Sequence, residues 1–339
     1  MKQQFQKFAK LALFFVYLVI IAGALVRMTG SGMGCPDWPK CFGYIIPPTD
    51  IKQLLWKPNH QYNDGQVIIK DEKLLVATGN FKTETLFEEA YWRAYTKHDY
   101  AIFNATETWI EYINRLFGAL AGFFVFIMAV LSFWYWKKNK LITVLSWLTV
   151  LLMGVQAWLG AKVVYSVLNP MKITIHMLVA LIIVAILIYI IQIVSPRKEG
   201  FIINKNIKYI LFVSLIFTLI QIILGTQVRQ FVDEQIKFLG DDQMGLILQN
   251  PKLNFYIHRS FSILILGLNV YLFLINKKQN LGLTKINWVM ILLGIEIISG
   301  IIMSYFGFPF GSQTVHLVIA SILFGLQFYM ILTYRTEDF

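Results

Sequence analysis

Eight long apolar runs alternate with shorter polar segments along the chain. A helix of about 20 apolar residues crosses a bilayer, so each run is interpreted as the centre of a transmembrane helix. The pattern predicts an all-α polytopic membrane protein with eight transmembrane helices. The runs cover residues 11–26, 116–135, 141–161, 173–194, 207–225, 261–275, 286–303 and 315–332.

The composition supports this class. Charged residues make up 14% of the chain and hydrophobic residues 57%, whereas a soluble domain carries about 25% charged residues. The net charge is +11, and the basic residues gather in alternate connections. By the positive-inside rule these connections and both termini face the cytoplasm, and a nucleic-acid partner is not expected. The residues are Lys2, Lys7, Lys10, Lys137, Lys138, Lys140, Arg197, Lys198, Lys205, Lys208, Lys277, Lys278, Lys285 and Arg335.

Short motifs of the first half recur in the second half in the same order. Such a repeat predicts two pseudo-symmetric four-helix bundles, residues 1–199 and 200–339. The first half carries an insertion, the outer loop 30–108, which we expect to fold partly as short helices over the first bundle. The matched segments are GALVR 23–27 with GTQVR 225–229, YINR 112–115 with YIHR 256–259, and Gly154 and His176 with Gly294 and His316.

The N-terminal lysines and the following apolar run resemble a signal peptide. The repeat includes this segment, which indicates that it stays in the mature protein. No Arg- and Ser-rich transit peptide precedes it, so a bacterial inner (plasma) membrane is expected.

The chain has two cysteines, Cys35 and Cys41, in the outer loop. On the outer side of a membrane such a pair forms a structural disulfide or serves as a redox-active dithiol, and the sequence leaves both roles open.

Three of the five histidines begin predicted spans on the outer side, at similar depth. Ionisable groups inside a membrane are functional hypotheses by default. His258 and His316 fall on different helices of one predicted bundle, and facing histidines in a bundle core are a recurrent way to bind haem iron. The alternatives to a haem site are a hydrogen-bonded polar contact that holds the helices together and a structural zinc site. His60 and His98 lie in the outer loop and are expected to be solvated.

Four arginines recur at the outer helix ends: Arg27, Arg115, Arg229 and Arg259. They could pair with haem propionates through their planar guanidinium groups, or extend to the membrane interface.

The two halves differ at one ligand position, where the first half has Asn114 and the second has His258. The first half also carries Glu111 on the same helical face as Asn114. A haem bound there by His176 alone would keep an open iron position beside a carboxylate suited to proton transfer. The alternative is that Glu111 only pairs with Arg115. Glu296 lies in the middle of its span, where a proton path is a weaker hypothesis.

Taken together, these residues resemble the haem A synthase family. The resemblance covers the whole chain and rests on GALVRMTGSGMGCPDWPKCFG at 23–43, EYINR at 111–115, and the histidines of the spans. It implies a haem b bound by His258 and His316 in the second half. It also implies that haem O binds in the first half, where its C8 methyl group is oxidised to a formyl group with Glu111 as catalytic residue, and that Cys35 and Cys41 can pair.

The chain departs from the family pattern E-x-x-H-R at Asn114, so a second histidine ligand for the substrate haem is not implied. The implied partners are haem O, the haem O synthase that supplies it, membrane lipid and an electron donor or acceptor that the sequence does not identify. A transmembrane haem-based electron carrier and a haem-binding transporter without catalysis are the competing functions. An electron carrier would need two histidines in both halves, and Asn114 argues against it. Glu111 and the pair Cys35 and Cys41 favour an enzyme over the transporter.

Overall fold

The computed structural model describes residues 1–98, 100–195 and 202–336. Within these residues eight helices are long and apolar enough to cross a membrane, and each predicted run lies inside one of them, with the short η4 turn completing the second. The helices are α1 Lys2–Met28, α2 Ala105–Ser132, α3 Lys140–Tyr165, α4 Pro170–Val194, α5 Lys205–Leu239, α6 Leu253–Gln279, α7 Ile286–Tyr305 and α8 Ser312–Thr333, with 3₁₀ turns η1 Ser31–Met33, η2 Ile51–Gln53, η3 Glu89–Tyr91, η4 Phe133–Tyr135 and η5 Asp241–Leu246.

Asparagine side chains set the start of four consecutive helices. Each accepts a hydrogen bond from a backbone N–H of the first helical turn, which satisfies donors that have no partner within the helix. Pro170 follows one of these caps at a position where a missing N–H costs nothing. The caps are Asn104 for α2, Asn139 for α3, Asn169 for α4 and Asn204 for α5.

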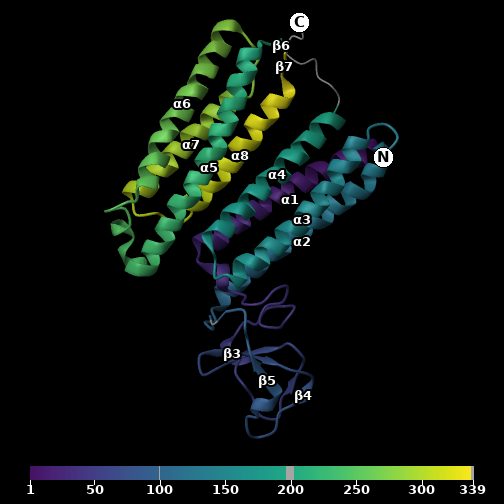
Figure 1. Ribbon diagram of the computed structural model, residues 1–339, viewed down its shortest axis with the longest axis vertical. Helices are drawn as coiled ribbons and strands as arrows, with labels where there is room; N and C mark the ends of the chain where they lie inside the picture. The colour runs from purple at the N-terminus through teal and green to yellow at the C-terminus, as the bar shows by residue number, and fades with distance from the viewer. Residues whose placement is uncertain (99, 196–201, 337–339) are drawn as a thin grey trace.

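Figure 1 shows the eight helices in two groups, α1–α4 and α5–α8, side by side. Helices α4 and α8 are in contact between the groups, as are α1 with α8 and α4 with α5. The N-terminus and the last turn of α8 lie at one end of the helices, and the segment between α1 and α2 lies at the other. The predicted boundary at residue 199 lies outside the described residues, as do Arg197 and Lys198, and the pseudo-two-fold relation stays a prediction.

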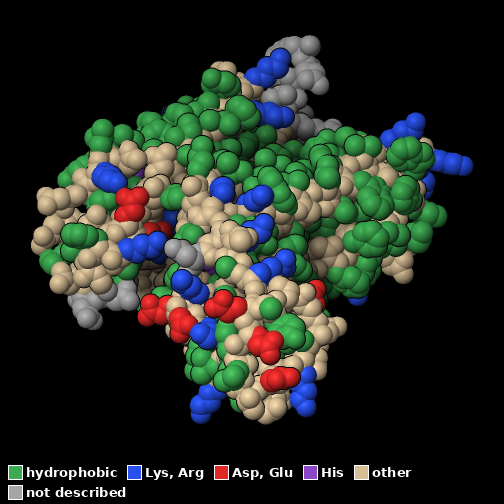
Figure 2. Space-filling view, turned by 60° about the horizontal axis from the view of Figure 1, so that its bottom comes forward, with side chains coloured by type: hydrophobic (Ala, Val, Ile, Leu, Met, Phe, Trp, Pro, Cys, Tyr) green, Lys and Arg blue, Asp and Glu red, His purple; other side chains and the backbone are tan. Residues whose placement is uncertain are grey.

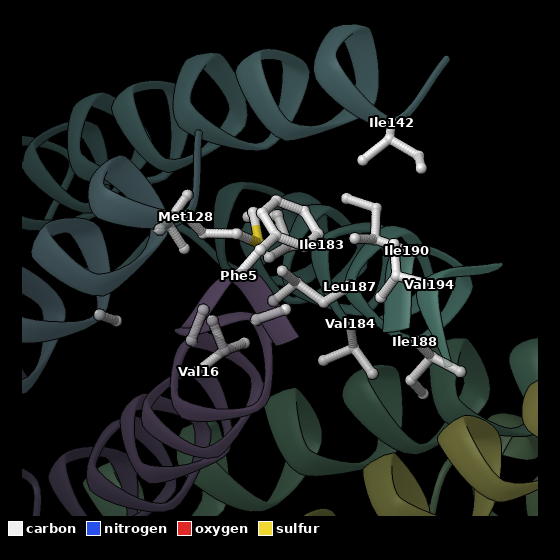
Figure 3. Packing of buried hydrophobic residues seen from close by; sticks show 14 of the residues in the cluster. Phe5, Val16, Met128, Ile142, Ile183, Val184, Leu187, Ile188, Ile190 and Val194 are labelled. Atoms are coloured by element: carbon white, nitrogen blue, oxygen red, sulfur yellow. The ribbon is translucent and has the colours of Figure 1, made fainter. Parts of the chain in front are cut away.

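Small side chains let the helices of the first group pack closely. Ala9 and Ala12 of α1 are fully buried beside Phe5. Figure 3 shows Phe5 beside Met128 of α2, with Leu187 of α4 in the same cluster. Because lipid tails are as apolar as these side chains, close van der Waals packing holds such helices together in a bilayer.

The loop between α1 and α2 contains the expected short helices, as the 3₁₀ turns η1, η2 and η3, but most of its regular structure is a small β domain that was not expected. Its strands form a two-stranded sheet, β1–β4, and a three-stranded sheet in the order β2–β3–β5. Asp71 and Glu72 both have positive φ in the two-residue turn between β2 and β3, as a tight hairpin requires. The strands are β1 Gln61–Tyr62, β2 Val67–Lys70, β3 Lys73–Ala77, β4 Phe81–Lys82 and β5 Trp92–Ala94, and a further pair, β6 Ile202–Ile203 and β7 Arg335–Thr336, lies near the C-terminus.

Two small apolar clusters hold the β domain together, one around Phe42 and Leu54 and one around Tyr62 and Ile68. Gly43 (φ +79°) packs against the backbone of Gly65, where an added Cβ would lie 2.3 Å from the carbonyl oxygen. Figure 2 shows acidic and basic side chains spread over the exposed surface of this domain, in front of a largely apolar helical body. The domain is therefore a solvent-facing cap with its own modest core.

Candidate functional site

His258 and His316 face each other within the second helix group. His258 lies in the second turn of α6 and His316 in the second turn of α8, and their ring centres are 6.3 Å apart. A metal–imidazole bond of about 2 Å puts a bound metal roughly 3 Å from each ring centre. The separation therefore fits one metal ion between the two rings, as in a six-coordinate haem.

A cavity of about 560 Å³ opens around these two rings. This volume lies in the range of about 300–1,000 Å³ that is usual for cofactor sites. Apolar side chains such as Ile265, Leu293 and Leu317 line much of it, and Arg27, Arg229 and Arg259 contribute guanidinium groups. An apolar cavity with cations among its lining residues matches a porphyrin with two carboxylates.

The ring of His316 is held from α7. Its Nδ1 lies 3.0 Å from Oε2 of Glu296 and 2.8 Å from Oγ of Ser299. His258 has a different environment: Gln221 donates to its carbonyl oxygen at 2.9 Å, and its own Nδ1 is buried without a partner among the described residues. The two facing imidazoles are thus oriented by unlike surroundings.

His176 of α4 lies in the first helix group without such support. Gln156 of α3 donates to the carbonyl oxygen of His176 at 3.0 Å, and within the described ranges Nδ1 of His176 has no hydrogen-bond partner. Oδ1 of Asn114 is likewise buried without a described partner. These unsatisfied polar atoms show that the first group leaves hydrogen-bonding capacity free in its interior.

A glycine of the neighbouring helix lies against each of the four positions singled out by the repeat. A Cβ on any of these glycines would approach the facing side chain to 3.1–3.9 Å. Only at Gly225, where the distance to the His258 ring is 3.1 Å, would a Cβ crowd the facing side chain; at the other three glycines the contact of 3.8–3.9 Å would be an ordinary one. The pairs are Gly23 with Asn114, Gly160 with His176, Gly225 with His258 and Gly300 with His316.

Glu111 is almost fully buried where α2 meets the outer loop. Its Oε2 accepts the backbone N–H of Cys35 at 2.8 Å, and its Oε1 accepts from Arg115 one turn later. Arg115 also donates to the carbonyl oxygens of Cys35, Asp37 and Lys40. The predicted ion pair between Glu111 and Arg115 is therefore present, and each of the two side chains also forms hydrogen bonds to the backbone of the loop. No hydrogen bond or ion pair joins Glu111 to His176 among the described residues.

Cys35 and Cys41 form a disulfide in this loop, and both are buried. A sulfur without access to other thiols exchanges slowly, so the placement favours the structural role over the redox role. Within the same turn the carboxylate of Asp37 accepts from the backbone N–H groups of Phe42 and Gly43. Burial raises the pKa of Asp37 above its usual value, and these two hydrogen bonds and the charge of Arg115 partly offset that effect.

An ion-pair triad joins the two helix groups at the end of the helices where α1 leads into the loop that carries the β domain. Asp233 lies in the extended end of α5 and binds Arg229 at 2.7 Å and Arg27 of α1 at 3.0 Å. Arg229 also donates to the carbonyl oxygen of Arg27 at 3.2 Å. Arg27 belongs to the first half of the sequence but lines the cavity of the second group.

The other predicted residues are placed as follows. Arg259 is exposed at the cavity and lies over the rings of Phe255 and Tyr256. His60 is exposed, as predicted. His98 is not simply solvated: it is half-buried, and its Nε2 lies 3.0 Å from the carbonyl oxygen of Pro36.

Sequence reasoning missed Asp233 and Ser299, and it did not pair Glu296 with His316. The spacing of Arg229 and Asp233 by four residues was a usable signal for one ion pair on the face of a helix. The link from Asp233 to Arg27 spans 206 positions and leaves no local signal. Within the described residues no group of three or more His, Cys, Asp or Glu side chains gathers for a metal ion, so the zinc alternative gains no support.

Comparison with known proteins adds to this geometry. A family model described as cytochrome oxidase assembly protein matches residues 6–67 and 65–328. A "Heme A synthase" from Wolbachia pipientis wMel is 28% identical to the chain, covering 95% of the chain and 90% of that protein. A protein with the same name from Rickettsia prowazekii is 24% identical, and the match covers 92% of the chain and 92% of that protein. Another from Flavobacterium psychrophilum is 22% identical, and the match covers 93% of the chain and 94% of that protein.

The ion-pair triad predicts a stability effect that an exposed pair does not have. Asp233→Asn removes the shared charge between two arginines that are largely buried, and should lower the free energy of unfolding by about 1–3 kcal/mol. Glu234→Gln breaks the exposed pair with Lys252 and should cost less than about 1 kcal/mol. Thermal unfolding of the purified protein in detergent measures both. Equal melting temperatures for the two variants would show that the triad does not join the helix groups.

Proposed function

The chain belongs to the haem A synthase family of cytochrome oxidase assembly proteins, an oxidoreductase family, and on this premise we propose that it is a haem A synthase. Its substrate would be haem O, whose C8 methyl group becomes a formyl group. The proposal assigns the substrate to the first helix group, residues 1–199, and a permanent haem b to the second, residues 200–339.

The observation that carries the proposal is the pair of facing imidazoles of His258 and His316, 6.3 Å apart beside an apolar cavity. The donor set fits haem iron, because two neutral imidazoles complete an octahedron around a porphyrin. Arg229 has a buried Nη1 with no partner in the described part of the chain, a donor suited to a propionate. When bound, haem b would supply one-electron transfer.

The first group differs in a way that suits chemistry. His176 would bind the substrate iron on one side, and Asn114 is too weak a ligand to close the other side. Its buried amide could instead donate a hydrogen bond to a molecule bound near the iron. Arg115 already binds three carbonyl oxygens and Glu111, so its role would be to hold the loop and the catalytic carboxylate in place.

The reaction has a definite balance. Oxidation of the methyl group follows R–CH₃ + H₂O → R–CHO + 4 H⁺ + 4 e⁻, and we assign dioxygen as the acceptor that the electrons and protons reduce to two water molecules. Glu111 is buried and charge-paired, and it would take up and release protons at the reacting carbon.

The proposed location is a bacterial inner membrane with both termini in the cytoplasm. The connections between α2 and α3 and between α6 and α7, which carry basic residues, lie at the end of the helices opposite the β domain. By the positive-inside rule that end is cytoplasmic, so the β domain and the cofactor cavity would lie toward the outer face. A haem O synthase in the same membrane would supply the substrate.

The alternative functions rank lower. A transmembrane electron carrier would need a second pair of facing histidines, and Asn114 occupies the corresponding position. A haem-binding transporter would not need a buried carboxylate such as Glu111, paired with Arg115, in the helix group assigned to the substrate.

The proposal predicts that Glu111 is needed for product and not for haem b. Cells that make haem O and express the wild-type chain should yield haem A on aerobic extraction, and Glu111→Gln should lower that yield by a factor of about 10²–10⁴. Glu107→Gln, one turn earlier on α2, is the matched control and should retain the yield. No haem A from the wild type would refute the synthase assignment, and normal yield from Glu111→Gln would leave Glu111 a structural residue.

The ligand assignment is tested separately by haem content. His258→Ala and His316→Ala should each purify without the tightly bound low-spin haem, because an imidazole is removed from one side of the iron. His176→Ala and the exposed control His60→Ala should keep it. Absorption spectra and the extracted b-type haem per chain measure the result, and an unchanged low-spin spectrum in both first variants would contradict the assignment.

A further inference from the structure

We infer that Glu296 is a positioning residue for the haem ligand His316, and that its carboxylate lowers the reduction potential of the haem in the second helix group. The inference rests on the proposed function, since it requires a haem between His258 and His316. It concerns a residue that neither the repeat nor the resemblance assigns to that haem.

The hydrogen bonds around His316 identify which of its nitrogens carries the proton. The Oγ of Ser299 can donate its proton to the backbone carbonyl of Glu296 at 3.0 Å, which leaves it free to accept from the ring. Oε2 of the Glu296 carboxylate is the other atom facing Nδ1. A neutral imidazole carries one donor and one acceptor nitrogen. With two acceptors facing it, Nδ1 carries the proton and leaves the lone pair of Nε2 for a metal.

The carboxylate does more than fix the tautomer. A metal-bound imidazole that donates its other N–H to a carboxylate becomes a stronger electron donor. A stronger donor and a nearby negative charge both favour ferric over ferrous iron. The side chain of Glu296 is only 13% exposed, so solvent screens this charge weakly. The reduction potential of the haem should therefore be lower than that of a haem with unassisted imidazoles.

The first helix group provides an internal comparison. Gln156 occupies the position that matches Glu296 in the repeat, and it donates to the backbone carbonyl of His176 instead of accepting from the ring. Leu159 occupies the position that matches Ser299. Nδ1 of His176 consequently lacks a partner among the described residues. His316 is thus hydrogen-bonded to a carboxylate, whereas the equivalent His176 is not. The two imidazoles should therefore differ in how strongly they donate electrons to a bound metal.

The test is a redox titration of the haem in purified protein, followed by absorption, with electron paramagnetic resonance (EPR) of the ferric form. Glu296→Gln gives the second group the residue of the first, and should keep a low-spin haem whose midpoint potential is more positive and whose g-values are altered. Ser299→Ala keeps the carboxylate and should shift the potential less, in the same direction. Glu234→Gln removes an equal charge from an exposed site of the same helix group and should leave the potential unchanged.

The outcomes separate this inference from the proposed function. A wild-type protein without a low-spin haem contradicts the proposed function itself. A low-spin haem in wild type and in Glu296→Gln with the same potential and the same g-values overturns only the role of Glu296. If Glu296→Gln fails to retain haem, Glu296→Asp decides, because it draws the carboxylate back from the ring. A midpoint potential more positive than that of the wild type supports the role, and a wild-type potential overturns it.

Discussion

The structure depends on one constraint: a polar side chain inside a membrane must find a partner, because no bulk water is present to solvate it. In the second helix group the constraint is met around His316, whose ring is bonded to Glu296 and Ser299. In the first group it is only partly met, since His176 and Asn114 keep buried atoms without partners in the described chain. Nδ1 of His258 in the second group is also buried without a described partner, so each group keeps unused hydrogen-bonding capacity near its histidines.

The two groups are linked by charge at the end of the helices where α1 leads into the β domain. Asp233 binds an arginine from each group, and Arg27 reaches from the first half of the sequence to the cavity of the second. The outer loop is fixed in a related way, through Arg115 and Glu111. Arg27, Arg229, Arg115 and Glu111 were candidate site residues from the sequence, and here they also hold the fold together, whereas Asp233 was not predicted.

The spans and the depth of the histidines were predictable because apolar runs and the internal repeat are local patterns. The pairing of His258 with His316 followed from that depth, and the structure brings the two rings together. The β domain was missed because its strands are short and its cores are small, so propensity gave a weak signal. The contacts of Asp233 with Arg27 and of Glu296 with His316 depend on packing between helices, which a single sequence does not encode locally.

The central claim is that the two helix groups bind haem in unlike ways, one with two imidazoles and one with a single imidazole and an open position. EPR of the ferric protein loaded with both haem b and haem O tests it most directly. The account predicts one low-spin signal of bis-imidazole type and one high-spin signal of comparable intensity. Two equivalent low-spin signals would contradict it, because both irons would then carry two strong axial ligands.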